Sequence, residues 1–108
     1  MPRRGEVWWV RLDPTLGSEI SKTRPCLVIS STVINQRRKT VVVVPLSTAP
    51  QASPPLLVPV RCGGRNVVAV IDQVRAVSKI RLDQCLGELS PEHLEDVEQA
   101  LRDVLELD

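Results

Sequence analysis

The sequence predicts a mainly β fold, in which a small, strongly bent antiparallel sheet or barrel is followed by a C-terminal α-helix. The first observation is a series of short stretches rich in valine and isoleucine, separated by polar or proline-rich segments. The second is sustained helical periodicity in residues 91–106, at the end of the chain. With 108 residues and no internal repeat, residues 1–108 are expected to form a single domain.

The first half of the chain is expected to hold three strands. Residues 7–12 (VWWVRL) combine β-branched and aromatic side chains, which favour a strand. Residues 15–25 (TLGSEISKTRP) are polar without apolar alternation, and are expected to form a loop. Residues 26–30 follow as a short apolar strand, and residues 31–35 as a turn or short helix. Residues 40–45 (TVVVVP) are apolar on both faces, which indicates a central, buried strand.

Further strands are expected in the second half. Residues 46–55 contain hydroxyl groups and several prolines, and are typical of a surface loop. Residues 56–60 form an edge strand, because the prolines around them cannot donate to a sheet ladder. A hairpin turn then leads into one long strand at residues 66–77. Residues 80–89 hold one more short strand.

The last segment has clear helix signals. Ser90 is suited to the N-cap position and Pro91 to the first helical position. Apolar side chains then recur at helical spacing, at Leu94, Val97, Leu101, Val104 and Leu105. The pattern predicts an amphipathic helix that packs on the sheet.

Charge is distributed unevenly along the chain. The formal net charge is only +1, but residues 1–81 hold 13 Lys and Arg against four acidic residues, a charge of +9. Residues 82–108 hold one Arg against nine acidic residues, a charge of −8. This division suggests a basic functional body and a separate acidic element. A solvated acidic helix beside scattered arginines is an equally open interpretation.

Aromatic side chains are scarce. Trp8 and Trp9 are the only aromatic residues, since the chain has no Phe or Tyr. Stacking of successive bases on aromatic rings is therefore excluded as the main grip on nucleic acid, and at most one Trp can stack on a base.

No residue pattern indicates a metal or cofactor. The cysteines, Cys26, Cys62 and Cys85, are far apart, and the single histidine, His93, lies in the first turn of the predicted helix. Walker and GxGxxG motifs are absent. An odd number of cysteines cannot form a closed set of disulfides, so we expect a reduced protein. The start of the sequence does not resemble a signal peptide, and no run approaches about 20 apolar residues. We therefore expect a cytoplasmic protein that does not enter a membrane.

Residues that can handle a phosphodiester without a metal lie in loops beside the predicted strands. Arginine presents a planar set of donors that matches phosphate oxygens, and hydroxyl groups add neutral donors. A nearby carboxylate can act as a base or orient the arginine. Arg24 is the candidate cation at the exit of the polar loop, where Pro25 restricts it to an extended conformation. By composition alone, the same residues could equally form a plain anion-binding surface.

Short motifs in a fixed order make the chain resemble the MazF/PemK family of toxins from bacterial toxin–antitoxin pairs. The motifs are RGEVW at residues 4–8, LDP at 12–14, GSE at 17–19, KTRP at 22–25, VPLST at 44–48, DQVR at 72–75 and LS at 89–90. A lone TRP or DQxR motif would be weak, but the ordered set spans nearly the whole chain.

The resemblance implies an SH3-like barrel that forms a homodimer and cuts single-stranded RNA (mRNA, with rRNA and tRNA as further candidates) at a specific sequence. It implies no metal and no cofactor, products with a 2′,3′-cyclic phosphate and a 5′-hydroxyl, and a cognate antitoxin protein as partner. Two alternatives stay open: a toxin of the same fold that binds and poisons DNA gyrase, and an inactive RNA- or protein-binding module. Retention of Arg24 and Thr48 argues against the gyrase poison.

Site residues follow from the same resemblance. Arg24 and Thr48 match the two catalytic positions. Glu19 is the candidate general base or arginine-orienting group, with an exposed loop acid as the alternative. The residues expected to contact RNA are Lys22, Ser47, Gln73 and Arg75. For the last two, a structural hydrogen-bond network at a strand end is an equally open role.

Overall fold

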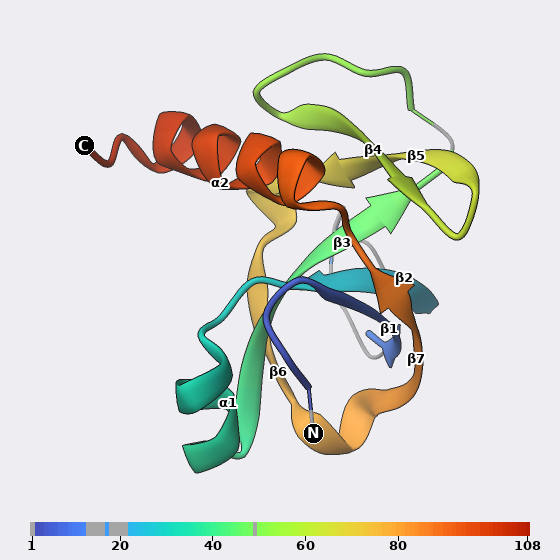
Figure 1. Cartoon of the computed structure of the whole chain (residues 1–108), viewed down its shortest axis with the longest axis vertical. Coiled ribbons are helices and arrows are strands. Elements are labelled where there is room, and N and C mark those ends of the chain that lie inside the picture. Colours follow the sequence, from blue (N-terminus) through green and yellow to red (C-terminus); the bar gives the residue numbers. More distant parts are fainter. Residues whose placement is uncertain (1, 13–16, 18–21, 49) are drawn as a thin grey trace.

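The computed structural model of the protein describes residues 2–12, 17, 22–48 and 50–108. A strongly curled antiparallel sheet is followed by a C-terminal helix (Figure 1). The strands are β1 (Glu6–Arg11), β2 (Thr23–Val28), β3 (Thr40–Ser47), β4 (Leu57–Cys62), β5 (Arg65–Val70), β6 (Arg75–Ser78) and β7 (Leu82–Glu88). The helices are α1 (Thr32–Arg37) and α2 (Pro91–Leu105), and two short 3-10 turns are η1 (Ile71–Gln73) and η2 (Lys79–Arg81). The predicted fold class, a strongly bent antiparallel barrel with a C-terminal helix, is confirmed.

Strand β3 is the centre of the sheet, as its apolar sequence predicts. The strand order is β4-β5-β3-β2-β1-β7, and β6 also pairs with β3. One edge of β3 pairs with β2. The first half of β3 also pairs with β6, from Thr40 to Val43, and its end pairs with β5 at Leu46 and Ser47. Because β3 has different partners along its length, the sheet bends around it.

Each face of the central strands packs into its own core. Strand side chains alternate between the two faces of a sheet, so neighbouring residues enter different cores. One core lies beneath α2 and the β4–β5 hairpin, and includes Val7, Leu27, Val44, Leu46, Val58, Val60, Ala69, Ile71 and Val97. The other core contains Val10, Leu12, Cys26, Val28, Val41, Val43 and Val77.

Helix α2 begins and packs as predicted. The Ser90 side chain accepts a hydrogen bond from the His93 backbone N–H at 3.2 Å, which satisfies one of the free donors of the first turn. Pro91 takes the first helical position. The helix lies across β4 and η1 (Figure 1) and buries Val97 and Ala100 against the first core. In the part of the chain described by the structure, no helix is long and apolar enough to cross a membrane.

A buried asparagine connects the N-terminal lead, α1 and β3. Asn35 is fully buried, and its amide donates to the backbone oxygens of Pro2 at 3.3 Å and Ser30 at 3.1 Å. The Ser30 hydroxyl donates to Asn35 Oδ1 at 2.5 Å and accepts from the Val42 N–H at 2.9 Å. Because every polar atom has a partner, the burial of this amide is compensated.

The polar segment was predicted as a loop through Pro25, and this is wrong at its end. Strand β2 begins at Thr23, so Arg24 and Pro25 are strand residues. Arg24 pairs with Val10 and Pro25 with Trp9, both on β1. Pairing of β2 with β3 begins only at Cys26. A proline is tolerated here because, among the described strands, one side of the chain at Pro25 is unpaired.

The single long strand predicted at residues 66–77 is also wrong. Strand β5 ends at Val70, η1 follows, and β6 begins at Arg75. The turn η1 carries the chain from the end of β3 to its first half. Strand β5 pairs with β3 at Leu46 and Ser47, whereas β6 pairs with it from Thr40 to Val43. Smaller differences are that β3 extends to Ser47 and that β4 runs from Leu57 to Cys62.

Candidate active site

Arg24 and Thr48 line the same pocket. The pocket has a volume of about 230 Å³. Because Cys26 of β2 pairs with Pro45 of β3 in antiparallel register, the start of β2 lies beside the end of β3. Ser47 is the last residue of β3, and Thr48 follows it. The lining residues are Trp9, Thr23, Arg24, Pro25, Leu46, Ser47, Thr48, Arg65 and Val67.

Two guanidinium groups lie near one buried thiol on this side of the sheet. Burial raises the pKa of the Cys26 thiol to about 12, although the positive charges of Arg75 and Arg24 act to lower it. The alternation of β2 places Arg24 on the same face as Cys26, and the β3–β6 pairing places Arg75 opposite Val43 on that face. Arg75 and Arg24 therefore both place positive charge near the Cys26 thiol, although Arg75 does not line the pocket.

The arrangement offers several hydrogen-bond donors to one anion. Arg24 is half-buried and Thr48 is exposed, so a ligand can reach the hydroxyl while the guanidinium is partly shielded from water. Thr23 and Ser47 add two further hydroxyl groups to the lining. A guanidinium and hydroxyl groups that line one pocket are suited to a phosphate group.

Trp9 and Arg65 complete the pocket, and the sequence did not single out either of them as a site residue. Trp9 comes from β1 and Arg65 from the first position of β5. The alternation of β1 gave one signal, since adjacent Trp8 and Trp9 must point to opposite faces. Trp8 packs against the second core, and Trp9 stays 36% exposed beside Pro25.

An apolar pocket of about 270 Å³ adjoins the first one. It shares with the first pocket Trp9, Pro25, Leu46, Thr48, Arg65 and Val67. Cys62, Gly63 and Leu86 line this second part and are absent from the first. The two pockets form one cleft with a cationic end at Arg24 and an apolar end at Leu86.

The other predicted site residues lie as follows. Lys22 is exposed directly before β2, in a left-handed conformation with φ 69°, and its carbonyl accepts from the Leu12 N–H at 2.9 Å. Gln73 is half-buried at the end of η1. Neither residue lines the two pockets of the cleft. Glu19 lies outside the described residues.

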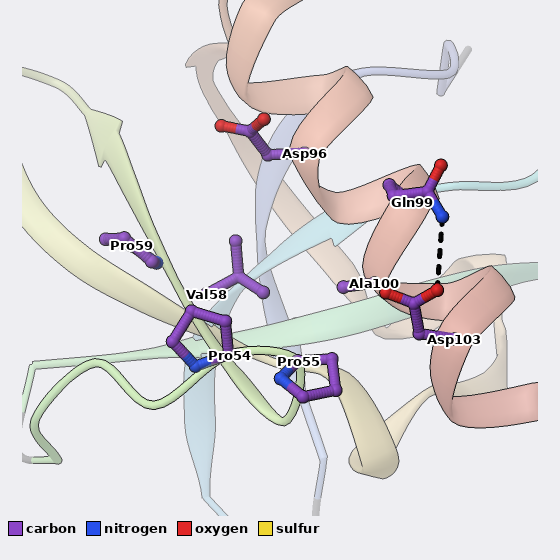
Figure 2. Close-up of a pocket in the computed structure, with 8 residues that line it drawn as sticks. All are labelled: Pro54, Pro55, Val58, Pro59, Asp96, Gln99, Ala100 and Asp103. Carbon is purple, nitrogen blue, oxygen red and sulfur yellow. Dashed lines mark hydrogen bonds between the residues drawn. The ribbon is translucent and has the colours of Figure 1, made fainter.

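A separate pocket of about 310 Å³ lies between α2 and the segment that leads into β4 (Figure 2). Its walls are the rings of Pro54, Pro55 and Pro59 on one side and α2 on the other. Two carboxylates, Asp96 and Asp103, face it, and Gln99 Nε2 donates to Asp103 Oδ1 at 3.1 Å. The residues predicted to bind RNA do not line this pocket. Within the described ranges, His, Cys, Asp and Glu side chains form no cluster of three that could hold a metal ion.

Comparison with known proteins agrees with the family predicted from the motifs. A family model described as PemK-like, MazF-like toxin of type II toxin-antitoxin system matches residues 3–105. The chain is 33% identical to the endoribonuclease MazF9 of Mycobacterium tuberculosis, over 99% of this chain and 98% of that protein. It is also 33% identical to the endoribonuclease EndoA of Bacillus subtilis, over 93% and 90%. The named activity of these relatives agrees with the predicted enzyme class.

Solved structures share the fold. An endoribonuclease from a mycobacterial species, in complex with its cognate antitoxin, superposes with a TM-score of 0.82 at 26% identity, over 100% of this chain and 98% of that one. MazF from Deinococcus radiodurans superposes with a TM-score of 0.87 at 24% identity, over 97% and 96%, a likeness of fold alone. The family match over residues 3–105 and the full-length relatives show that this chain belongs to the PemK-like, MazF-like toxins of type II toxin–antitoxin systems.

Proposed function

We propose that this toxin is an endoribonuclease that cuts single-stranded RNA at a short specific sequence. The observation that carries the proposal is the joint lining of one pocket by Arg24 and Thr48. Both residues match the positions that the family motifs identify as catalytic, and the relatives are named endoribonucleases. The basic body of the chain, with a charge of +9 over residues 1–81, supports an anionic polymer as substrate.

The proposed reaction is an attack of a ribose 2′-oxygen on the neighbouring phosphorus. A new P–O bond forms as the bond to the 5′-oxygen of the next nucleotide breaks, which leaves a 2′,3′-cyclic phosphate and a 5′-hydroxyl. A base takes the proton of the 2′-hydroxyl, and the leaving 5′-oxygen receives a proton. Negative charge increases on the non-bridging oxygens in the transition state, so donors fixed in place before the reaction lower the barrier.

Arg24 and Thr48 supply those donors in this mechanism. The guanidinium of Arg24 stabilises the developing charge and donates a hydrogen bond to the leaving 5′-oxygen, which takes its proton from water. The Thr48 hydroxyl donates to a non-bridging oxygen. Each donor of this kind contributes roughly 10²–10³ in rate in other enzymes. Glu19 is the proposed base or orienting group for Arg24. Lys22, Ser47, Gln73 and Arg75 are proposed RNA contacts.

The test of this function is incubation of the purified protein with a mixed single-stranded RNA in a metal-chelating buffer, followed by mapping of the 5′ ends. We expect cuts at one short sequence, and new 5′ ends that a polynucleotide kinase labels without prior phosphatase treatment. RNA that stays intact while the protein still blocks growth would contradict the proposal. Inhibition of DNA gyrase by the same preparation would then support the gyrase alternative.

The proposed partners are a cognate antitoxin and a second copy of this chain. A mycobacterial relative has been solved in complex with its cognate antitoxin. The cleft presents Arg24 and Arg65, and such a surface is complementary to an acidic antitoxin segment. We expect co-expression with the antitoxin to abolish RNA cleavage, and size-exclusion chromatography of the toxin to give the mass of a homodimer. A monomeric mass would contradict the dimer and leave the nuclease proposal standing.

A further inference from the structure

We propose that the apolar end of the cleft binds one nucleobase next to the cut, with Trp9 as the ring on which that base stacks. This inference rests on the proposed nuclease function, and adds a base-binding residue to it. The cleft joins an apolar pocket to the pocket of Arg24 through shared walls. A nucleotide, which carries a flat ring beside an anionic group, matches this pair of pockets.

The backbone of β1 places the Trp9 ring at the open end of the first core. Val7 and Trp9 lie on the same face of β1, and Val7 is buried in that core. Across the ladder, Trp9 pairs with Pro25, and both residues line the two pockets. An indole that is 36% exposed over an apolar floor offers a face to a base, and base–aromatic stacking tolerates any base type.

A bulge in β7, the strand next to β1, adds an apolar residue to the pocket. Val7 pairs with Gly87 and Trp8 with Cys85, so Leu86 is an additional residue on β7 with no residue opposite. Such bulges redirect a side chain and are frequent next to active sites. Leu86 lines the apolar pocket together with Trp9. The sheet irregularity therefore supplies an apolar wall beside the indole.

The rim of the pocket carries polar groups that suit a nucleotide. Thr48 lies in both parts of the cleft, so a base in the apolar part is directly adjacent to the phosphate position. Arg65 is exposed on the same rim and offers a planar cation to a base or a phosphate. Gly63 has φ 59°, and no atom of the described residues lies within 4 Å of where a Cβ would be, so none of their side chains fills that part of the rim. The volume of about 270 Å³ is close to the lower end of ligand pockets, roughly 300 Å³, and suits a single ring system.

The main test is a double-mutant cycle between Trp9→Ala and an abasic residue in an RNA oligonucleotide that spans the mapped cut. Stacking of one base accounts for roughly 5- to 100-fold in affinity. We expect Trp9→Ala to raise KM by that factor, with a much smaller change in kcat. An abasic residue on one side of the cut should raise the KM of the wild type by the same factor. It should not raise the KM of Trp9→Ala any further. Trp9→Phe should restore most of the affinity, and Trp8→Phe is the matched control with unchanged KM.

A second readout needs no cleavage. Trp8→Phe leaves Trp9 as the sole tryptophan, because the chain has only two. An oligonucleotide with a single 2′-deoxy nucleotide at the cut lacks the attacking hydroxyl and stays intact. We expect it to quench the Trp9 fluorescence, and its abasic version to quench much less. Cys26 is buried, so a Cys85→Ser variant leaves Cys62 as the thiol that a maleimide can reach. The same oligonucleotide should slow the alkylation of Cys62 in that variant.

The outcomes separate this inference from the proposed function. The base pocket would be overturned if Trp9→Ala had the wild-type KM and if an abasic residue raised KM equally in both proteins. Cleavage by the wild type in the same experiment would still support the proposed nuclease function. If Trp9→Ala does not fold, the fluorescence and Cys62 measurements decide. If the wild type cuts no RNA, quenching of Trp9 by a mixed single-stranded RNA retains the base pocket without the nuclease. A Trp9 signal that responds only to an antitoxin peptide overturns it.

Discussion

Two pockets of this domain have similar sizes and opposite charges. The pocket of Arg24 and Thr48 has a volume of about 230 Å³, and the pocket beside α2 about 310 Å³. The first presents two arginines and several hydroxyl groups. The second combines proline rings with the carboxylates of Asp96 and Asp103 (Figure 2). The larger cavity is therefore the one that would repel a phosphate, so chemistry rather than volume identifies the candidate active site.

The difference follows the division of charge along the chain. The pocket of Arg24 and Thr48 is built from the basic body, on β1, β2, β3 and β5, and the acidic pocket lies against α2. The apolar face of α2 completes the first core, while its outer face carries the acidic residues. The acidic helix therefore completes the core of the fold, and the candidate site lies on the basic strands.

The largest expected effect is that of Arg24→Ala. Loss of the guanidinium removes the strongest donor to the phosphate, and we expect RNA cleavage to fall by about 10²–10³ or more. Arg102→Ala, an exposed arginine in the last turn of α2, is the matched control and should cleave at the wild-type rate. The circular dichroism spectrum should be unchanged in both variants. Cleavage by Arg24→Ala at the wild-type rate would remove Arg24 from its role.

Thr48→Ala should have the second largest effect. The variant loses one neutral donor at the same phosphate, and we expect a fall of about 10² in kcat/KM. Thr48→Ser keeps the hydroxyl and should stay within about tenfold of the wild type. A rate for Thr48→Ala within about threefold of the wild type would count against a catalytic role.

A pH measurement tests the burial behind the basic pocket. The Cys26 thiol has its pKa raised from 9.0 to about 12, because burial outweighs the opposing effects of Arg75 and Arg24. Between these values the unfolded chain loses the thiol proton and the folded chain keeps it. The free energy of unfolding should therefore fall as pH rises from about 9 to about 12, by at most about 1.4 kcal/mol per pH unit. Urea unfolding at several pH values should show that the free energy of unfolding falls more steeply with pH in the wild type than in Cys26→Ala. Equal slopes in the two proteins would contradict this prediction.

The smallest effect is expected on the acidic side. Asp96→Asn and Asp103→Asn remove charges from exposed positions on α2, which solvent and salt screen from the cleft. RNA cleavage should change by less than about twofold, and stability by about 0.5 kcal/mol or less. A large loss of cleavage in either variant would show that the pocket beside α2 also belongs to the functional site.

The sequence predicted the elements whose signals are local. The Ser90-Pro91 start of α2 and the buried run of β3 depend on neighbouring residues, and both are confirmed. The start of β2 was missed because a proline is a strand residue only where one side of the chain is unpaired. The break at η1 was missed because it depends on β3 having two partners along the same edge, which a linear pattern does not contain.

Some residues of the candidate site could likewise be predicted from local motifs, whereas others could not. Ordered motifs identified Arg24 and Thr48, and the structure brings them to one pocket. Trp9 and Arg65 meet there only because the sheet curls, since β5 and β1 are not neighbours in the strand order. Two adjacent tryptophans on a strand predict one on each face, but not which of the two faces meets the β4–β5 hairpin. That assignment requires the three-dimensional arrangement of the curled sheet.

The pairing of β1 with β7 has a consequence for how the toxin is made. The first strand of the chain is held on one edge by the last strand, so its pairing closes a loop that spans most of the sequence. Non-local pairing of this kind is slow, and during synthesis the N-terminal strand emerges long before its partner. The cleft, with walls from β1, β2, β3, β5 and Leu86 of β7, is complete only when nearly the whole chain has left the ribosome. A translation product that ends before β7 would therefore lack a formed cleft.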